Sequence, residues 1–566
     1  MLDPVEEFLK VDTMDFHEVD PLEEPPIGGY EVSVLERMKR LGTAVKLTTA
    51  NSDPEQQKSI DWSLLCHWSS QYRSDPDCPP DLVDKMYRKK TAHEKIKCIF
   101  DVPKLNRKIA LDARKMVVEN YNRGRKNGTT ARNYLKMGLE ALNAKEYDKA
   151  LESFNLGLIC APHPAGTDDP VMKSLYSMLF VSRSRAFKGL GRYNESWDDY
   201  HEACELNNSS RFIETLLTTQ VEICREIIAI KFTPKKTHDF PVDLDEFDFR
   251  KQDQSQTLSN ALKPLKLEYK REKGRSVVTT ESLDVTGILI AEEAYVAWLA
   301  PPFYEKYCYH CQRSLKDRPF PCQSCIYVRY CSFKCQAKSW RTYHSVECKF
   351  MGHLKYLSIG QLALRIVFMN KVVPSLESYK SYASCKPSLR ENKLTFKKTL
   401  GDLLTLGTHE NHRENLLTQC MFAAAFLTHL ASNMAFILDE DHYNFGGLMF
   451  KLLAILKINV SSIADDAITV SESDCCFVIE KKVIIGAGLF PTFALINHSC
   501  EPNCASAFIG TRIMVTATRP IKAGEEVTIS YLSETDDRSY ESRHKLLIDR
   551  WHFSCTCPPC KQKIDC

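Results

Sequence analysis

Apolar residues recur at the spacing of helices in two parts of the chain. Between 131 and 203, large and small residues alternate with polar ones in the order of two consecutive helical hairpins. Further along, the apolar stretches Glu414 to Leu438 and Gly447 to Leu456 predict two more helices. Polar residues such as His429 and Asn433 interrupt the longer stretch, so the pattern favours a buried helix over a membrane span.

A strand pattern occurs near the end of the chain. After Gly524, the residues Val527, Ile529 and Tyr531 alternate with polar ones, which predicts a half-buried strand that ends in a tyrosine. Upstream of it, the polar segment Asn497 to Asn503 ends in proline and asparagine, which favour turns, so we expect a loop there. Together with the helices, these patterns predict an α+β multidomain fold.

Composition and charge place the chain among ordinary folded proteins. At 566 residues it is long enough for roughly three or four domains. Its formal net charge of +2 argues against a protein built to coat nucleic acid or an anionic membrane. The first residues lack the basic region and apolar run of a secretory signal, so we expect no export and a cytoplasmic and nuclear location. The 23 cysteines are therefore expected to be reduced, many of them as zinc ligands.

The helical pattern between 131 and 203 resembles two tetratricopeptide repeats. The residues that match the large, small and helix-ending positions are Tyr134, Gly138, Tyr147, Ala150, Phe154, Gly157 and Pro162 in the first copy, and Phe180, Ser184, Gly191, Tyr193, Ser196, Tyr200 and Ala203 in the second. Each hairpin buries its apolar face only against a neighbour, so we expect helices at Lys104 to Asn122 and Phe212 to Ile230 to complete the stack. The resemblance implies a peptide-binding groove or a packing scaffold, and the sequence leaves both open.

Eight residues of metal-ligand type occur in paired spacing between 308 and 348. The pairs are Cys308 and Cys311, Cys322 and Cys325, Cys331 and Cys335, and His344 and Cys348. Four ligands complete a tetrahedral zinc site, so eight predict two sites, and metal binding would supply the folding free energy of so short a segment.

This spacing resembles a MYND zinc finger, in which the pairs interleave. The resemblance implies one zinc ion on Cys308, Cys311, Cys331 and Cys335, and a second on Cys322, Cys325, His344 and Cys348. It also implies proline-rich peptides as partners of the finger. Nucleic acid is not expected to be the main partner, although Lys334, Lys338 and Arg341 leave DNA contact open.

The polar segments near the end of the chain carry a further resemblance. The two signature segments of SET-domain lysine methyltransferases are matched in order by Asn497-His498-Ser499-Cys500-Glu501-Pro502-Asn503 and by Gly524-Glu525-Glu526-Val527-Thr528-Ile529-Ser530-Tyr531. Taken alone, an Asn-His pair is more often a satisfied polar group at a strand end. With the finger, residues from about 263 to 566 resemble the SET- and MYND-domain (SMYD) family, and the repeats indicate its tetratricopeptide-bearing branch. The helical domain that other members carry after the last cysteines is expected to be absent.

A third cysteine motif lies close to the carboxyl end. It supplies three ligands, Cys555, Cys557 and Cys560. A tetrahedral zinc ion needs a fourth ligand, and the SET resemblance implies Cys500. Cys504 and Cys566 remain alternatives. The metal would then hold the carboxyl-terminal tail over the active site.

The resemblance also implies a cofactor and a catalytic group. S-adenosylmethionine would donate the methyl group, and Tyr531 would position the amine of a protein lysine against it. The residues implied to bind the cofactor are Lys273, Gly274, Arg275, Asn459, Asn497, His498, Tyr531 and Phe553. Trp551 would lie at the lysine channel. Ser276 stands where the family more often has a glycine.

The motifs together predict the order of domains. It comprises a partly disordered N-terminal region (1–95), a tetratricopeptide-like helical region (96–233), a linker (234–262), the first part of a β-rich SET domain (263–307), the MYND finger (308–348), a helical SET insert (349–480), the catalytic SET part (481–534) and a zinc-bound post-SET region (535–566). The expected activity is S-adenosylmethionine-dependent methylation of lysines in histone or non-histone proteins, with three zinc ions. The alternative is a weakly active or inactive scaffold that recruits protein partners. Under either interpretation the repeats are candidates for binding a protein, and no membrane contact is expected.

Overall fold

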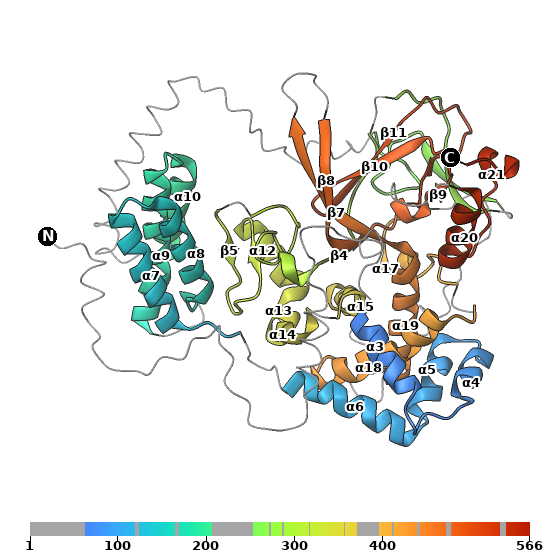
Figure 1. The fold of residues 1–566 in the computed structure, drawn as a ribbon, viewed down its shortest axis with the longest axis horizontal. Helices are drawn as coiled ribbons and strands as arrows, with labels where there is room; N and C mark the ends of the chain where they lie inside the picture. Colours follow the sequence, from blue (N-terminus) through green and yellow to red (C-terminus); the bar gives the residue numbers. More distant parts are fainter. Residues whose placement is uncertain are drawn as a thin grey trace. The chain divides into compact units, whose positions relative to one another are not determined.

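The chain forms two compact units, each with its own core. The computed structural model describes residues 63–118, 124–164, 169–206, 253–270, 273–285, 288–315, 317–355, 357–370, 395–409, 412–437, 442–470, 477–532 and 539–565 (Figure 1). The first unit holds the described residues of 124–206 and 304–352, and the second holds those of 63–118, 253–303 and 353–565. Of the N-terminal region 1–95, predicted to be partly disordered, residues 1–62 lie outside the described residues, as does the predicted helix at Phe212 to Ile230, whereas residues 63–95 are described and contain helices. The predicted mixture of helices and sheets is confirmed.

Two helical hairpins make up most of the first unit. Their helices are α7 (Gly128–Asn143), α8 (Tyr147–Cys160), α9 (Pro170–Gly189) and α10 (Tyr193–Leu206). Asn127 and Asp169 begin α7 and α9, because their side chains accept hydrogen bonds from backbone N–H groups of the first turn. A Cβ atom at Gly138 would overlap the ring of Phe154, so the close approach of α7 and α8 requires a glycine there.

The cysteine-rich segment completes the first unit. Its strands β5 (Phe320–Pro321) and β6 (Arg329–Tyr330) pair antiparallel, and α12 (Phe333–Ser339) follows. The amide of Ile326 donates to the carbonyl of Gly124 at 3.1 Å, and β5 packs against α8. The predicted finger and the helical hairpins therefore share one core.

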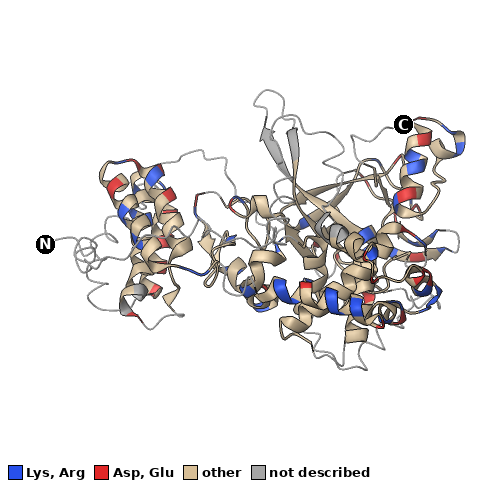
Figure 2. Cartoon of the chain, turned by 60° about the horizontal axis from the view of Figure 1, so that its bottom comes forward, with Lys and Arg blue, Asp and Glu red and all other residues tan. Residues whose placement is uncertain are grey.

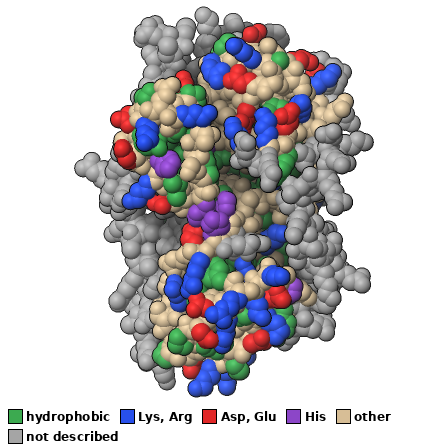
Figure 3. All heavy atoms as spheres, turned by 90° about the vertical axis from the view of Figure 1, so that its right-hand side faces the viewer, with side chains coloured by type: hydrophobic (Ala, Val, Ile, Leu, Met, Phe, Trp, Pro, Cys, Tyr) green, Lys and Arg blue, Asp and Glu red, His purple; other side chains and the backbone are tan. Residues whose placement is uncertain are grey.

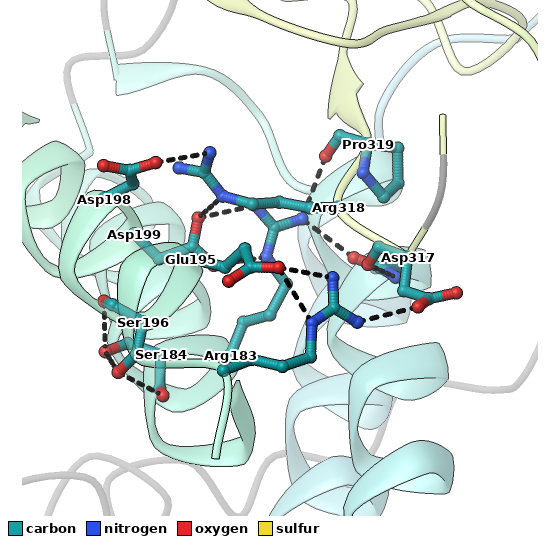
Figure 4. Close-up of polar contacts among 11 residues, drawn as sticks. Arg183, Ser184, Glu195, Ser196, Asp198, Asp199, Asp317, Arg318 and Pro319 are labelled. Atoms are coloured by element: carbon teal, nitrogen blue, oxygen red, sulfur yellow. Dashed lines mark hydrogen bonds and ion pairs between the residues drawn. The ribbon is translucent and has the colours of Figure 1, made fainter. Parts of the chain in front are cut away.

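A buried ion pair joins α9, α10 and the cysteine-rich segment. Arg183 Nε lies 2.6 Å from Asp199 Oδ2, and both side chains are fully buried. Asp199 Oδ1 also accepts from Arg318 Nε at 2.8 Å, and Arg183 donates to the carbonyl of Pro319 at 2.9 Å (Figure 4). One aspartate thus neutralises charge from two parts of the unit.

Asp199→Ala is expected to destabilise the first unit by about 3–5 kcal/mol, because it leaves the buried guanidinium of Arg183 without a counter-ion. Native-state hydrogen exchange of α9 and α10 measures this loss. The matched control is Glu195→Ala, whose partner Arg192 is partly exposed and whose ion pair contributes at most about 1 kcal/mol. Equal protection in the two variants would contradict the role of the buried pair.

Helices and sheets both contribute to the second unit. Its longer helices are α3 (Ser63–Arg73), α4 (Leu82–Arg88), α5 (Ala92–Phe100), α6 (Pro103–Val118), α15 (Ile359–Met369), α18 (Asn415–Asn433), α19 (His442–Asn459) and α20 (Tyr540–Trp551). α18 and α19 are the two helices predicted from apolar periodicity. α3, α5 and α6 pack on α18, and the rings of Trp68 and Phe426 lie 4.5 Å apart.

The prediction that Lys104 to Asn122 extends the repeat stack is wrong. α6 belongs to the second unit, where it packs on α18 and α5. Its buried residues recur at helical spacing, which shows that one face is covered but not what covers it. The helical region predicted for 96–233 therefore contains parts of both units.

Residues 253–262, the end of the predicted linker, are also part of the second unit. Leu258 is 1% exposed and Ala261 is fully buried. Leu258 forms a bridge with Phe396, and Ala261 forms one with Ile290. The segment was predicted to be a linker because it is polar, but its backbone pairs with the core, so that assignment is corrected.

Four small sheets lie in the described part of the second unit. They are β1 (Leu265–Lys270) with β2 (Gly274–Thr279); β10 (Cys504–Ile509), β11 (Arg512–Ala517) and β3 (Ile288–Glu293); β4 (Val296–Leu299), β8 (Phe477–Leu489) and β7 (Val460–Val470); and β9 (Asn497–His498) with β12 (Thr528–Ile529). The β9–β12 pair is parallel and the other pairs are antiparallel. β7 corrects the predicted helical insert, since the chain turns from helix to strand at Val460.

The charge of the surface and the apolar character of the helices bear on which partners the protein can have. Figure 2 shows Lys and Arg interspersed with Asp and Glu along the helices, and the two signs occur in nearly equal numbers in the sequence. Of the helices that the structure describes, none combines the length and the apolar character needed to cross a bilayer.

Candidate functional site

Three segments that are far apart in the sequence meet at the predicted signature residues. Asn497–His498 and Thr528–Ile529 pair as parallel strands. β2 joins them, because the amide of Val527 donates to the carbonyl of Val277 at 2.8 Å. The backbone thus brings the two signature segments beside the hairpin that contains Lys273.

The carboxamide of Asn497 ties these segments together. Its Nδ2 donates to the carbonyl of Arg275 at 3.0 Å and to Glu526 Oε1 at 2.8 Å. The other carboxylate oxygen of Glu526 lies 2.9 Å from Lys273 Nζ. Asn497 Oδ1 has no hydrogen-bond partner among the described residues, so it can accept a bond from a ligand.

Both ring nitrogens of His498 contact the protein. Nδ1 accepts a hydrogen bond from the amide of Tyr531 at 3.0 Å. In the neutral ring the proton is therefore assigned to Nε2, which lies 3.3 Å from Cys500 Sγ. The ring links the segment that carries Tyr531 to Cys500, so both of its nitrogens are engaged within the protein.

Tyr531 is held at the centre of an aromatic group. Its hydroxyl donates to the carbonyl of Ile496 at 2.7 Å. Its ring centroid lies 5.3 Å from that of His498, 5.2 Å from that of Trp551 and 6.3 Å from that of Phe553. Burial raises the pKa of Tyr531 well above its ordinary value, and the charge of Glu526 raises it further. The residue is therefore a neutral phenol at physiological pH.

The predicted cofactor residues Lys273, Gly274 and Arg275 lie where the turn after β1 leads into β2. Gly274 has φ +74°, which favours glycine, and among the described residues other than its chain neighbours no atom lies within 4 Å of where its Cβ would stand. Arg275 donates to the hydroxyl and the carbonyl of Thr405 at 2.9 and 2.7 Å. The guanidinium and the Lys273 ammonium are therefore both paired within the protein, and the turn itself is the open feature.

Asn459 lies at the end of α19, near the 405–407 loop that Arg275 contacts. Its Nδ2 donates to the carbonyls of Gly407 and Ile455 at 2.9 and 2.8 Å. Because Arg275 contacts Thr405, residues 405–407 lie between the two predicted cofactor residues. The structure shows no direct hydrogen bond from Asn459 to Asn497 or to the residues that Asn497 contacts.

Ser276, the position that departs from the family pattern, is fully buried. Its Oγ has no hydrogen-bond partner in the described part of the chain. A buried hydroxyl without a partner costs free energy, so a ligand that bonds to it would be favoured here. With Asn497 Oδ1 and the open turn at Gly274, the residues present fit a ligand that carries polar groups.

The carboxyl-terminal cysteines form a compact cluster with Cys500. The ligand atoms of Cys500, Cys555, Cys557 and Cys560 all lie within 4.8 Å of one another. Hydrogen bonds from Cys500 and from His498 lower the pKa of the Cys555 thiol to about 3. Cys504 is buried in β10 outside this cluster, and Cys566 is outside the described residues. The geometry therefore favours Cys500 among the three alternatives.

The cysteine-rich segment of the first unit brings together two further clusters. One contains Cys308, Cys311, Cys331 and Cys335, and the other contains Cys322, Cys325, His344 and Cys348, with ligand atoms within 4.8 Å in each. These are the interleaved sets that the finger resemblance implies. Four thiolates, or three and an imidazole, suit tetrahedral zinc, so each of the three clusters can hold one ion.

The residue-level prediction missed two side chains that organise the site. Glu526 bridges Asn497 and Lys273, as described above. Asn503 is 1% exposed, accepts from the Thr528 amide at 2.8 Å and donates to the Glu526 carbonyl at 2.8 Å. Both lie inside the signature segments, and that position was the signal that could have found them.

A group of histidines beside the aromatic residues was also missed. The ring centroids of His409 and His412 lie 5.1 and 4.9 Å from that of His552, whose Nε2 is 3.2 Å from Glu414 Oε2. In Figure 3, histidine side chains gather in the middle of the face shown. His552 follows Trp551 in the chain, so this group adjoins the predicted lysine channel. His409 and His412 are three positions apart, but His552 lies 140 positions after His412, so spacing could not have revealed the group.

Comparison with known proteins agrees with this geometry. A family model described as SET domain matches residues 64–532. The chain is 24% identical over 401 residues to protein-lysine N-methyltransferase SMYD4 of Homo sapiens, covering 57% of this chain and 50% of that protein. It is 30% identical over 257 residues to histone-lysine N-methyltransferase SMYD3 of Homo sapiens (44% and 51% covered), and 27% identical over 293 residues to N-lysine methyltransferase SMYD2-A of Xenopus laevis (51% and 59% covered). The chain spans about half the length of these relatives. The match over most of its length and the meeting of both signature segments show that the chain belongs to the SET domain family, with SMYD proteins as relatives.

Proposed function

We propose that this protein transfers methyl groups from S-adenosylmethionine to lysine side chains of histone or non-histone proteins. The observation that carries the proposal is that Asn497 and His498, on the parallel β9–β12 pair, meet Tyr531, which follows β12, beside the turn at Gly274. The lysine methyltransferase names of the relatives support the same reaction.

We assign cofactor binding to residues around this pair. Asn497 offers its free Oδ1, His498 its backbone and Phe553 its ring. The turn at Lys273, Gly274 and Arg275 contributes backbone groups, because its charged side chains already have partners. Asn459 would act from beside the 405–407 loop. When bound, S-adenosylmethionine supplies the activated methyl group.

Tyr531 orients the acceptor amine. Its proton is committed to the Ile496 carbonyl, so the lone pairs of its oxygen can accept a hydrogen bond from the lysine nitrogen. A free lysine has a pKa of about 10.4, and removal from water disfavours its ammonium form. Trp551 and Phe553 pack around Tyr531 and would exclude water from the amine. The site therefore favours the neutral amine that can attack a methyl group.

We propose that three zinc ions, one in each cluster, hold the two units in shape. The ion on Cys500, Cys555, Cys557 and Cys560 would tie the tail that carries Trp551 and Phe553 to the signature loop. The two ions on the finger would fold the cysteine-rich segment.

The proposal is tested first by the binding of S-adenosylmethionine to purified, zinc-loaded protein, measured by calorimetry. Asn497→Ala is expected to weaken binding by about 10-fold to about 100-fold, because it removes the free oxygen and loosens the Arg275 and Glu526 contacts. The matched control, Asn194→Ala on the exposed face of α10, should bind as the wild type does.

A folded, zinc-loaded protein that does not bind S-adenosylmethionine would refute the proposal. The remaining interpretation would be a scaffold that recruits partners through its repeats and finger. Thermal unfolding of Asn497→Ala separates the two causes of a loss, since a variant that melts as the wild type does has lost the ligand contact rather than the fold.

A further inference from the structure

A groove runs between α10 and the cysteine-rich segment within the first unit. Its volume is about 500 Å³. The side chains that shape it are Trp197, Asp198 and Glu202 from α10, and Arg318, Phe333 and Lys334 from the cysteine-rich segment. It lies in the first unit, whereas the residues assigned to methyl transfer lie in the second.

The positive charge at the base of the groove is already neutralised. Arg318 donates to Asp199 Oδ1 at 2.8 Å and to Asp198 Oδ2 at 3.2 Å. Figure 4 shows its guanidinium directed at these carboxylates of α10. Asp199 in turn neutralises the buried Arg183. The charges of these two arginines and two aspartates therefore cancel. One further carboxylate that lines the groove is outside this set.

That carboxylate is Glu202, which is half-buried and has no hydrogen bond or ion pair among the described residues. Burial raises the pKa of Glu202, and the charge of Arg318 only partly opposes this. A carboxylate desolvated without a partner costs free energy that a bound cation would recover.

Aromatic rings stand beside this carboxylate. Trp197 is half-buried and stacks on Tyr200, with ring centroids 6.1 Å apart and planes 24° apart. Phe333 is fixed by Phe320, whose ring centroid lies 4.5 Å away. An aromatic face next to a carboxylate suits an arginine or lysine side chain, whose stem packs on the ring while its charge meets the anion.

We propose that this groove binds one arginine or lysine side chain of a protein partner, with its charge at Glu202 and its stem on Trp197. His201 and Lys334 are exposed at the rim and carry or can carry the same sign, so they limit the site to one cation. Cys331, in the first metal cluster, also lines the groove, so its shape depends on the folded finger.

The test uses the full, zinc-loaded chain and two fluorescein-labelled peptides of Gly and Ser, one with a central arginine and one with glutamine in its place. Fluorescence anisotropy at low salt should show binding of the arginine peptide about 10-fold or more tighter than that of the glutamine peptide. Glu202→Gln should erase this difference. Glu205→Gln, on the exposed face of the same helix, should preserve it.

A charge-reversed variant guards against a general loss of folding. Glu202→Lys should prefer a peptide with central glutamate over the arginine peptide, which only a folded groove can do. The proposal fails if Glu202→Gln keeps the arginine preference or if the wild type binds both peptides alike. It also fails if a proline-rich peptide without cations displaces the arginine peptide, since the groove would then take a neutral segment.

Discussion

Tyr531→Phe is expected to lower kcat for methyl transfer by about 100-fold or more, while the Kd for S-adenosylmethionine changes by less than about 3-fold. The variant keeps the ring, and with it the packing on His498, Trp551 and Phe553. It removes only the hydroxyl that bonds to Ile496 and would orient the acceptor amine. Steady-state transfer of a radiolabelled methyl group to a lysine-rich histone mixture measures kcat, and calorimetry measures the Kd.

The matched control is Tyr443→Phe, whose ring is 40% exposed on α19, and its activity should equal that of the wild type. Unchanged methyl transfer by Tyr531→Phe would remove the residue from the catalytic role. Burial raises the pKa of Tyr531, so its phenol stays protonated from about pH 7 to about pH 9. Across that range the rate should rise as the substrate amine loses its proton, with no decline from ionisation of Tyr531.

Cys500→Ser is expected to remove one zinc ion per chain and to weaken S-adenosylmethionine binding by about 10-fold to about 100-fold. Cys500 Sγ lies 3.5 Å from Cys560 Sγ and 3.3 Å from His498 Nε2, so its loss breaks both the cluster and the link to the β9 strand. The tail that carries Trp551 and Phe553 would then detach from the signature loop. Elemental analysis counts the metal, and calorimetry measures the cofactor.

Cys504→Ser is the matched control for this variant. Cys504 is also buried and lies on the next strand, but its thiol is outside the cluster. The control should keep its full zinc content and its affinity for S-adenosylmethionine. If instead Cys504→Ser loses the ion and Cys500→Ser keeps it, the assignment of the fourth ligand is wrong.

His498 contacts two parts of the site, which explains why binding of the metal and binding of the cofactor are expected to depend on each other. Its two ring nitrogens contact the Tyr531 amide and the Cys500 thiol, at 3.0 and 3.3 Å. A shift of the cysteine cluster would therefore move the segment after β12 that carries the Tyr531 hydroxyl. The resemblance to SET domains implied a cofactor role for His498, whereas its side chain in the structure contacts the Tyr531 amide and the Cys500 thiol.

The sequence alone determined the features whose geometry depends on short spacings. Pairs such as Cys308 and Cys311 lie within one turn of chain, so their separation in space follows from their separation in sequence. The alternation at Val527 and Ile529 likewise indicated which side of the strand is buried, and both residues are indeed buried. The apolar periodicity of α18 and α19 is also a local pattern, so both could be predicted as helices from the sequence.

Tertiary structure decided which elements meet. Apolar periodicity shows that one face of α6 is covered, but a helical face fits many partners, so the choice of α18 over the repeats had no signal in the sequence. The same holds for Lys273 and Glu526, which are 253 positions apart, and for Arg318, which the fold brings to the carboxylates of α10. Long-range contacts depend on the packing of the whole chain, because no local pattern encodes which buried surface or charge another segment will meet.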